Sequence, residues 1–157
     1  EKGVDLVAEA ARLLPDIPFA VAGDGPGTVH FHGLKNVHMA GFLSGQTLQK
    51  AISGAALTLC PSRCRENCPL SVLESIALGT PVIGANHGGT PELIEPERTG
   101  LLFAPGDAGA MAACIRRVYD DGVLRTRMYT ACAGQSFLNA DAYCEKVETL
   151  YEGGVLR

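Results

Sequence analysis

Residues 61–74 read PSRCRENCPLSVLE, and this stretch decides both the fold class and the kind of site that the sequence predicts. It follows an apolar run at residues 56–60, which predicts a short buried strand. Residues 69–78 then predict a helix with proline in its first turn and Gly79 just past its end, the expected placement of both residues. The stretch therefore predicts a strand, a loop and a helix start.

Two glutamates flank this predicted helix start. Glu66 lies on the loop, and Glu74 lies about one and a half turns into the helix. The backbone N–H groups near Leu70 and Ser71 have no partner inside the helix, and together with the helix dipole they suit a diphosphate. Because Pro69 has no N–H, it cannot contribute to such a site. Carboxylates on either side can accept hydrogen bonds from sugar hydroxyls, so the pattern suits a nucleotide sugar.

Apolar runs alternate with helical patterns along the whole chain. The predicted strands are residues 19–22, 36–40, 56–60, 81–85 and 101–103. The predicted helices are residues 4–14, 44–53 with Ser44 as cap, 69–78, a short one capped by Thr90, 107–119 capped by Asp107, 123–137 and 140–152. This alternation predicts an α/β fold, a Rossmann-like parallel sheet with helices on both faces and a ligand site at the carboxyl ends of the strands.

Composition narrows the class of protein. The 157 residues are 46% hydrophobic and 19% charged, which suits one globular domain. The net charge of -4 without a basic cluster argues against a nucleic-acid partner. No apolar run approaches the roughly 18 residues needed to cross a bilayer.

The cysteines and histidines do not predict a metal site. Cys60, Cys64 and Cys68 have a spacing that matches neither common zinc motifs nor iron–sulfur runs, so we expect reduced thiols of a cytosolic protein. His30 and His32 share one strand face at best, and the four histidines form no ligand set.

The chain resembles the family 4 type of retaining glycosyltransferases, which have the GT-B fold. Glu66 and Glu74 match the family's Glu-x7-Glu mark. The other matching blocks, in the family's order, are KG at 2–3, GDGP at 23–26, NV at 36–37, GF at 41–42, LESIALGTPVI at 73–83, GGTPE at 88–92, GLL at 100–102 and PGD at 105–107. The resemblance covers nearly the whole chain. One departure is the sequence after Glu66, where the family usually has a glycine-rich stretch.

The resemblance implies roles for individual residues in binding a nucleoside-diphosphate sugar donor. Glu66 would contact the donor sugar beside the reacting centre, and Lys2 would stabilise the departing diphosphate. Glu74 would bind the ribose hydroxyls. The remaining implied donor contacts are the Leu70 and Ser71 amides on the phosphates, Phe42 and Leu43 beside the base, and Gly23, Gly25, Gly88 and Gly89, where backbone approaches the donor.

The resemblance also implies an architecture. Residues 1–157 would form the donor-binding domain, which is the C-terminal half of a GT-B enzyme, while an N-terminal half would bind an acceptor glycan, lipid or small metabolite. A central first strand would precede Lys2, and the chain alone would not transfer sugar. Catalysis in the family needs no metal. The expected location is the cytoplasm or the cytoplasmic membrane face, with membrane contact through the acceptor half.

Three other interpretations were weighed. A nucleotide-sugar epimerase of the same fold would need acid–base residues that have no evident place, and a non-catalytic nucleotide-sugar-binding module would not need both glutamates. The segment from Gly23 to Thr28 lacks the third small residue of a dinucleotide fingerprint, which disfavours an oxidoreductase.

Several other residues are interpreted as structural. Tyr119, Tyr143 and Tyr151 are expected to pack in the core at helical spacing, and Arg63 and Arg65 are expected to be surface charges.

Overall fold

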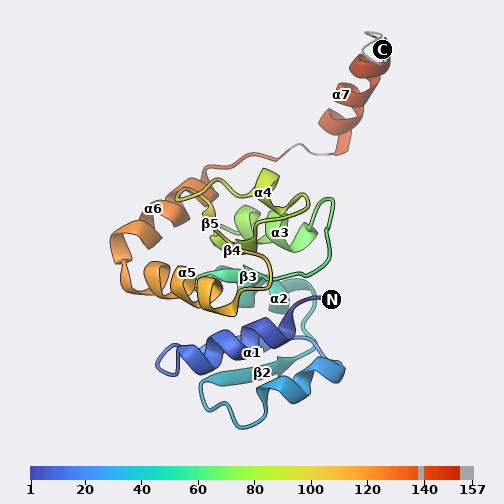
Figure 1. Cartoon of the computed structure of the whole chain (residues 1–157). Coiled ribbons are helices and arrows are strands. Elements are labelled where there is room, and N and C mark those ends of the chain that lie inside the picture. Colours follow the sequence, from blue (N-terminus) through green and yellow to red (C-terminus); the bar gives the residue numbers. More distant parts are fainter. Residues whose placement is uncertain (138–139, 153–157) are drawn as a thin grey trace.

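The computed structural model describes residues 1–137 and 140–152 (Figure 1). The elements in chain order are α1 (Val4–Leu13), β1 (Phe19–Ala22), the 3₁₀ helix η1 (Pro26–Phe31), β2 (Val37–Gly41), α2 (Gly45–Ser53), β3 (Thr58–Cys60), α3 (Leu70–Ala77), β4 (Val82–Ala85), α4 (Thr90–Leu93), β5 (Gly100–Phe103), α5 (Ala108–Asp120), α6 (Gly122–Ala133) and α7 (Ala140–Glu152).

The strands of the described residues form two parallel sheets. One pairs β1 with β2, and the other has the order β3-β4-β5. The predicted α/β class and parallel direction are therefore confirmed. Among the described residues no hydrogen-bonded ladder joins β1 to β3, so the parallel strands form two sheets.

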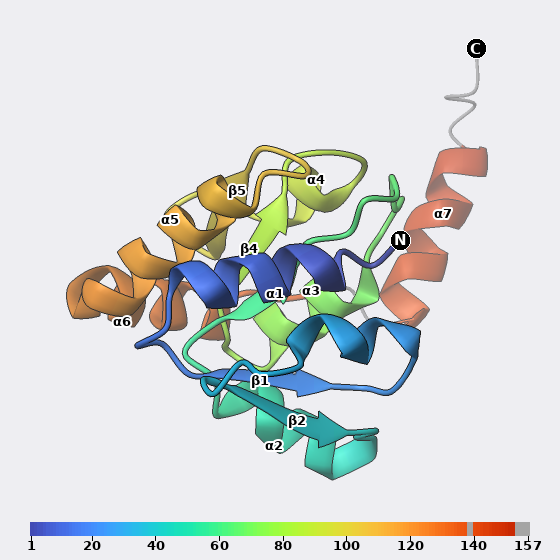
Figure 2. The ribbon, with the colours of Figure 1, turned by 60° about the horizontal axis from the view of Figure 1, so that its bottom comes forward.

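One hydrophobic core nevertheless joins the two sheets. It contains Leu6 of α1, Phe19 of β1, Ile83 of β4 and Ile115 of α5, all at least nine-tenths buried. Figure 2 shows α1 crossing the strands, next to α5. The two sheets therefore belong to one folded unit.

A second core lies on the other face of the three-stranded sheet. It includes Val72 and Ile76 of α3, Val82 of β4 and Cys132 of α6. Because successive side chains of a strand point to opposite faces, Val82 enters this core while Ile83 enters the first one. The central strand is thus apolar throughout, as expected for a parallel sheet covered on both faces.

Helix caps were predicted correctly only in part. Asp107 accepts a hydrogen bond from the amide of Ala110 at 2.8 Å and caps α5 as predicted. Ser44 is the N-cap residue of α2, as predicted, although its side chain makes no capping hydrogen bond. The prediction for Thr90 is wrong, since Gly89 is the N-cap and Thr90 is the buried first residue of α4.

Other local predictions need correction. Residues 26–31 form η1 rather than the strand considered for His30 and His32, because Pro26 starts a 3₁₀ helix. The helix predicted at 123–137 ends at Ala133. Tyr119, Tyr143 and Tyr151 are exposed rather than in the core, and α7, which carries two of them, has no buried residue and projects from the rest of the chain in Figure 1.

All six cysteines are free thiols, as the sequence predicted. Burial raises the pKa of the Cys132 thiol to about 11, so this group is protonated at neutral pH. Among the described residues, none of the helices combines the length and apolar character required to cross a bilayer.

The turn between α1 and β1 depends on one side chain, Asn36. Its Nδ2 donates to the carbonyls of Ala11, Leu14 and Ile17 at 3.0, 2.9 and 3.1 Å. The first two carbonyls belong to the end of α1, where backbone acceptors lose their helical partners. Asn36 therefore fixes the end of α1 against the strand that follows it.

We expect Asn36→Asp to lower the free energy of unfolding by about 1–3 kcal/mol, because it removes the donor and places an acceptor against three carbonyls. Urea denaturation followed by circular dichroism measures this change. Lys35→Ala, at the exposed neighbouring position, is the control and should stay within about 0.5 kcal/mol of the parent chain. Equal stability of the two variants would contradict this role of Asn36.

Candidate functional site

The predicted site residues lie on loops that follow the carboxyl ends of the strands. Gly23 and Gly25 follow β1, Phe42 and Leu43 follow β2, residues 61–69 follow β3, and Gly88 and Gly89 follow β4. Since the strands within each sheet are parallel, their carboxyl ends share one edge. This is the edge at which ligands bind in open α/β sheets.

Lys2 and Glu66 are brought into contact there, although 63 residues separate them in the sequence. The Lys2 Nζ donates to the Glu66 Oε1 at 2.9 Å. This hydrogen bond raises the pKa of Lys2 and lowers the pKa of Glu66, and a hydrogen bond from Ser62 lowers the latter further. Both groups are therefore charged at neutral pH. The Lys2 side chain is 74% exposed and that of Glu66 24%, so the ammonium faces solvent.

Backbone contacts hold Lys2 beside the loop after β3. The carbonyl of Glu1 accepts from the amide of Arg63 at 2.8 Å. Gly3, at the start of α1, has φ of 73° and lies so close to Pro61 that an added Cβ would stand 2.1 Å from the Pro61 oxygen. Only glycine fits both conditions. Arg63 is also ion-paired with Asp5 of α1, which strengthens the same contact.

The start of α3 leaves its first backbone amides available. Pro69 is the N-cap and provides no side-chain acceptor, so the amides of Leu70 and Ser71 have no partner one turn earlier. Leu70 and Ser71 are both exposed. Glu74 lies further along α3, also exposed, and its side chain makes no hydrogen bond or ion pair with the described residues. These backbone amides and this carboxylate are accessible to a ligand from solvent.

Buried hydroxyls fix α3 relative to the sheet. Ser75 and Thr80 are fully buried, and the Ser75 hydroxyl lies 2.6 Å from that of Thr58 on β3. The Ser75 hydroxyl donates to the Thr80 carbonyl at 2.9 Å, and the Thr80 hydroxyl donates to the carbonyl of Ile52 at 2.9 Å. This network fixes the start of α3 relative to the buried core.

The loop after β4 packs directly on the loop that carries Glu66. The amide of Gly89 donates to the Glu66 carbonyl at 2.7 Å, and a Cβ added to Gly89 would stand 1.7 Å from the Asn67 oxygen. A Cβ on Gly88 would stand 2.7 Å from the Glu66 oxygen. The His87 Nε2 donates to the Ser62 carbonyl at 2.8 Å. The close approach at these glycines is therefore to the backbone of residues 65–67.

The loops after β1 and β2 border a separate hollow. It has a volume of about 290 Å³ and is lined by Gly23, Asp24, Thr28, Phe31, His32, Met39 and Gly41. Gly25 and Phe42 adjoin this lining in sequence, Phe42 is 79% exposed, and Leu43 is partly buried. Cβ atoms added to Gly23 or Gly25 would meet open space. The predicted contact of Phe42 and Leu43 with a base, and of Gly23 and Gly25 with the donor, stays a prediction.

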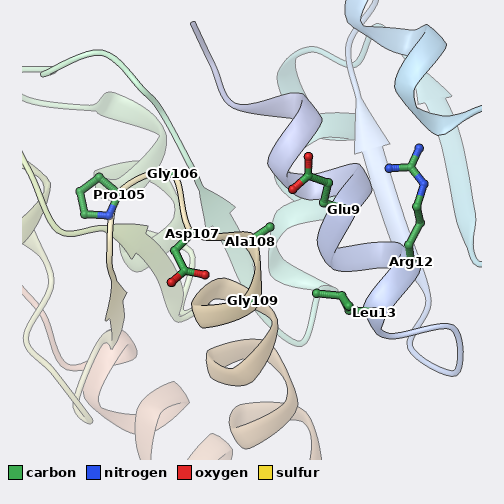
Figure 3. A pocket seen from close by; sticks show the side chains of 8 residues that line it. All are labelled: Glu9, Arg12, Leu13, Pro105, Gly106, Asp107, Ala108 and Gly109. Atoms are coloured by element: carbon green, nitrogen blue, oxygen red, sulfur yellow. The ribbon is translucent and has the colours of Figure 1, made fainter.

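A larger hollow, of about 670 Å³, contains none of the predicted site residues. It is lined by Glu9, Arg12 and Leu13 of α1 and by residues 105–109 at the start of α5 (Figure 3). Its walls hold two carboxylates, while the Arg12 guanidinium donates to the His30 carbonyl. The hollow therefore does not have the paired charges and free helix start found at the loop after β3.

Sequence reasoning missed three residues that build the site, namely Gly3, Ser62 and His87. The signal for Gly3 was its position beside Lys2 at a helix start. His87 contacts the Ser62 carbonyl, which lies 25 positions away in the sequence, and no local pattern shows such a contact. Within the described ranges, no cluster of three or more His, Cys, Asp or Glu side chains could hold a metal ion.

This geometry defines the class: an α/β domain whose parallel strands place a free helix start and paired charges at one edge, as in nucleotide-binding domains. Comparison with known families then makes the assignment specific. The chain belongs to the family described as glycosyl transferases group 1, whose model matches residues 1–133.

Characterised relatives support this membership. The chain is 34% identical over 139 residues to an alpha-D-kanosaminyltransferase of Streptomyces kanamyceticus, a match that covers 82% of this chain and 36% of that protein. It is 33% identical over 128 residues to sulfoquinovosyl transferase SQD2 of Arabidopsis thaliana, covering 77% of this chain and 25% of that protein. The chain thus spans well under half the length of these relatives.

Solved structures have the same fold. Sucrose-phosphate synthase from Thermosynechococcus elongatus matches with a TM-score of 0.80 at 27% identity, over 97% of this chain and 42% of that one. Anabaena HepE in complex with UDP and glucose matches with a TM-score of 0.79 at 23% identity, over 96% of this chain and 45% of that one. The fold is therefore the Rossmann-like half of a GT-B glycosyltransferase, as predicted.

We expect Gly3→Ala to lower the free energy of unfolding by more than about 2 kcal/mol, because the new Cβ overlaps the Pro61 carbonyl and the backbone is left-handed there. Urea denaturation measures the loss. Gly122→Ala is the control, since its Cβ would meet only the end of the Arg125 side chain at 3.9 Å. If both variants were equally stable, the close packing of Gly3 on Pro61 would be refuted.

We expect Lys2→Met to raise the pKa of Glu66, because the substitution removes its strongest hydrogen-bond donor and a neighbouring positive charge. NMR titration of the carboxyl carbons measures this pKa. Glu97, whose pKa is lowered by Arg117 instead, serves as an internal control and should not change. An unchanged pKa of Glu66 would mean that the ion pair does not form in solution.

The pKa shifts of Glu66 and Lys2 determine the pH range in which the ion pair stabilises the fold. The pKa of Glu66 is lowered from 4.5, so its contribution is present above that value and is lost as the pH falls through the folded pKa. The pKa of Lys2 is raised from 10.5, so its contribution is present below that value and is lost as the pH rises through the folded pKa.

Proposed function

We propose that residues 1–157 form the donor-binding domain of a family 4 type, retaining glycosyltransferase, which transfers a sugar from a nucleoside-diphosphate sugar to an acceptor hydroxyl. The observation that carries this proposal is the contact of Lys2 with Glu66 beside the free start of α3. This contact joins a cation and a carboxylate on the loop that leads into α3, whose first amides lack helical partners. The names of the two relatives above, both sugar-transferring enzymes, point the same way.

The proposed donor lies across the start of α3. Its diphosphate accepts hydrogen bonds from the amides of Leu70 and Ser71 and faces the Lys2 ammonium, where backbone donors and the helix dipole favour negative charge. Glu74 accepts hydrogen bonds from the ribose and Glu66 from the sugar. The base lies towards Phe42 and Leu43. Each of these protein groups thereby contacts one part of the nucleotide sugar.

The chemistry assigned to this site is electrostatic. As the bond from the sugar to the phosphate breaks, negative charge grows on the leaving diphosphate, and Lys2 and the α3 amides stabilise it. No metal ion is required for this in our proposal. The leaving phosphate takes up the proton of the acceptor hydroxyl, which attacks from the same face, so that configuration is retained. The domain's main contributions are positioning and charge stabilisation.

The acceptor binds elsewhere in our proposal. An acceptor domain, N-terminal in the family architecture, would supply contacts to a glycan, a lipid or a small metabolite, and any contact with a membrane. In our proposal, the central first strand of the family architecture would lie between the two sheets of this chain. The proposed location is the cytoplasm or the cytoplasmic membrane face, where activated donors are made.

Calorimetric titration of UDP, GDP and ADP into the chain tests the donor site. We expect one of the three nucleotides to bind, and we expect Glu74→Ala to weaken its binding by about 1–3 kcal/mol, the usual loss for an unpaired polar partner. Glu9→Ala is the matched control, an exposed glutamate on the helix α1, and should leave binding unchanged.

The outcomes separate the parts of the proposal. Binding that Glu74→Ala does not affect would move the ribose contact elsewhere. A folded chain that binds none of the three nucleotides would refute the donor site in this chain. Sugar transfer by the chain alone would refute the assignment of the acceptor site to another domain.

A further inference from the structure

The Lys2–Glu66 ion pair joins two groups that the proposed donor needs separately. Both partners are anchored by backbone contacts: the Glu1 carbonyl binds the Arg63 amide at 2.8 Å, and the Glu66 carbonyl accepts from the Gly89 amide at 2.7 Å. The 2.9 Å contact therefore forms between two fixed segments. Among the described residues, neither side chain has another ion-pair partner.

Within the ion pair each charge is thus compensated by the other. A nucleoside diphosphate without a sugar attracts the Lys2 ammonium through its phosphates. If Lys2 turns to the phosphates, the Glu66 carboxylate loses its cation and lies beside further negative charge, which is unfavourable. Among the described residues, no other ion-pair partner then remains for it.

A nucleotide sugar meets a different situation at the same two residues. Its phosphates again attract Lys2, but its sugar hydroxyls donate hydrogen bonds to the freed carboxylate. Hydrogen bonds to a charged acceptor are stronger than those between neutral groups. The loss of the ion pair is then offset by contacts that the bare nucleotide cannot make.

Resting on the proposed function, we infer that Glu66 makes the site selective for the sugar-bearing nucleotide over the spent nucleoside diphosphate, by competing for Lys2 whenever no sugar is present. Glu66 thereby favours loading of the donor and release of the product. The competition is of modest strength, because an exposed ion pair contributes little, and about two- to fivefold in affinity is the expected range.

The decisive variant is Glu66→Gln, which keeps the shape of the side chain and removes its charge. UDP and UDP-glucose are titrated into the parent and variant chains at one salt concentration. If the preceding titration selects another base, the nucleoside diphosphate and the nucleotide sugar of that base replace them. We expect Glu66→Gln to bind the diphosphate about two- to fivefold more tightly and the sugar nucleotide about tenfold more weakly. This opposite change distinguishes selectivity from general damage to the site.

Two controls make the result specific. Glu74→Gln, at the proposed ribose contact shared by both ligands, should weaken both by the same factor. In a Lys2→Gln background, Glu66→Gln should no longer strengthen diphosphate binding, because there is no ammonium to release. Circular dichroism and thermal unfolding confirm that each variant is folded.

The possible failures are distinguishable. Diphosphate binding that is weakened or unchanged by Glu66→Gln, in a chain that still binds nucleotide, overturns the inference and leaves the proposed function intact. If Glu66→Gln still tightens diphosphate binding in the Lys2→Gln background, competition for Lys2 is not the cause of the tighter binding. A folded parent chain that binds none of the nucleotides overturns the proposed function itself.

Discussion

The site depends on backbone segments that approach one another with no side chain between them. Gly3 lies against Pro61, and Gly89 lies against Asn67, in both cases closer than any Cβ would permit. These two contacts bring the chain before α1 and the loop after β4 onto the loop that carries Glu66. Lys2 reaches Glu66 only because both contacts fix that loop. Two glycines therefore determine the position of two charges.

This constraint acts on a frame that the core has already set. The hydroxyls of Thr58 and Ser75 hold α3 on β3, and the parallel strands of each sheet place the loops that follow them at one edge. An anion site made of backbone amides is then as rigid as the helix that provides it. Lys2, by contrast, is largely exposed and can turn from one partner to another. In our proposal, the rigid start of α3 binds the phosphates that all the ligands share. The mobile Lys2 side chain helps to discriminate between ligands with and without a sugar.

The sequence predicted the elements well where a local signal determines them. Strand Phe19–Ala22 and helix Ala140–Glu152 have the predicted bounds, and Asp107 caps α5 as expected, because apolar period and capping chemistry are local. Thr90 failed as a cap because Gly89 takes the N-cap position of α4, while Ser44 takes the N-cap position of α2 without a side-chain capping bond. Exposed Tyr143 and Tyr151 show that helical spacing predicts an apolar face but not what covers it. The interrupted ladder likewise depends on which strands find a partner, a non-local property.

The candidate site likewise combines features that local sequence predicts with features that depend on contacts between distant segments. The motif pattern predicted Glu66, Glu74 and the start of α3, and the structure places Glu66 and Lys2 in one ion pair that no local spacing could predict. The structure also explains why glycine stands at positions 88 and 89, since both residues pack on the backbone beside Glu66. A substitution at either glycine would therefore act through the carboxylate even without touching a ligand. Residues of this kind connect stability with selectivity, because the contact that orders the loop is also the contact that orients Glu66.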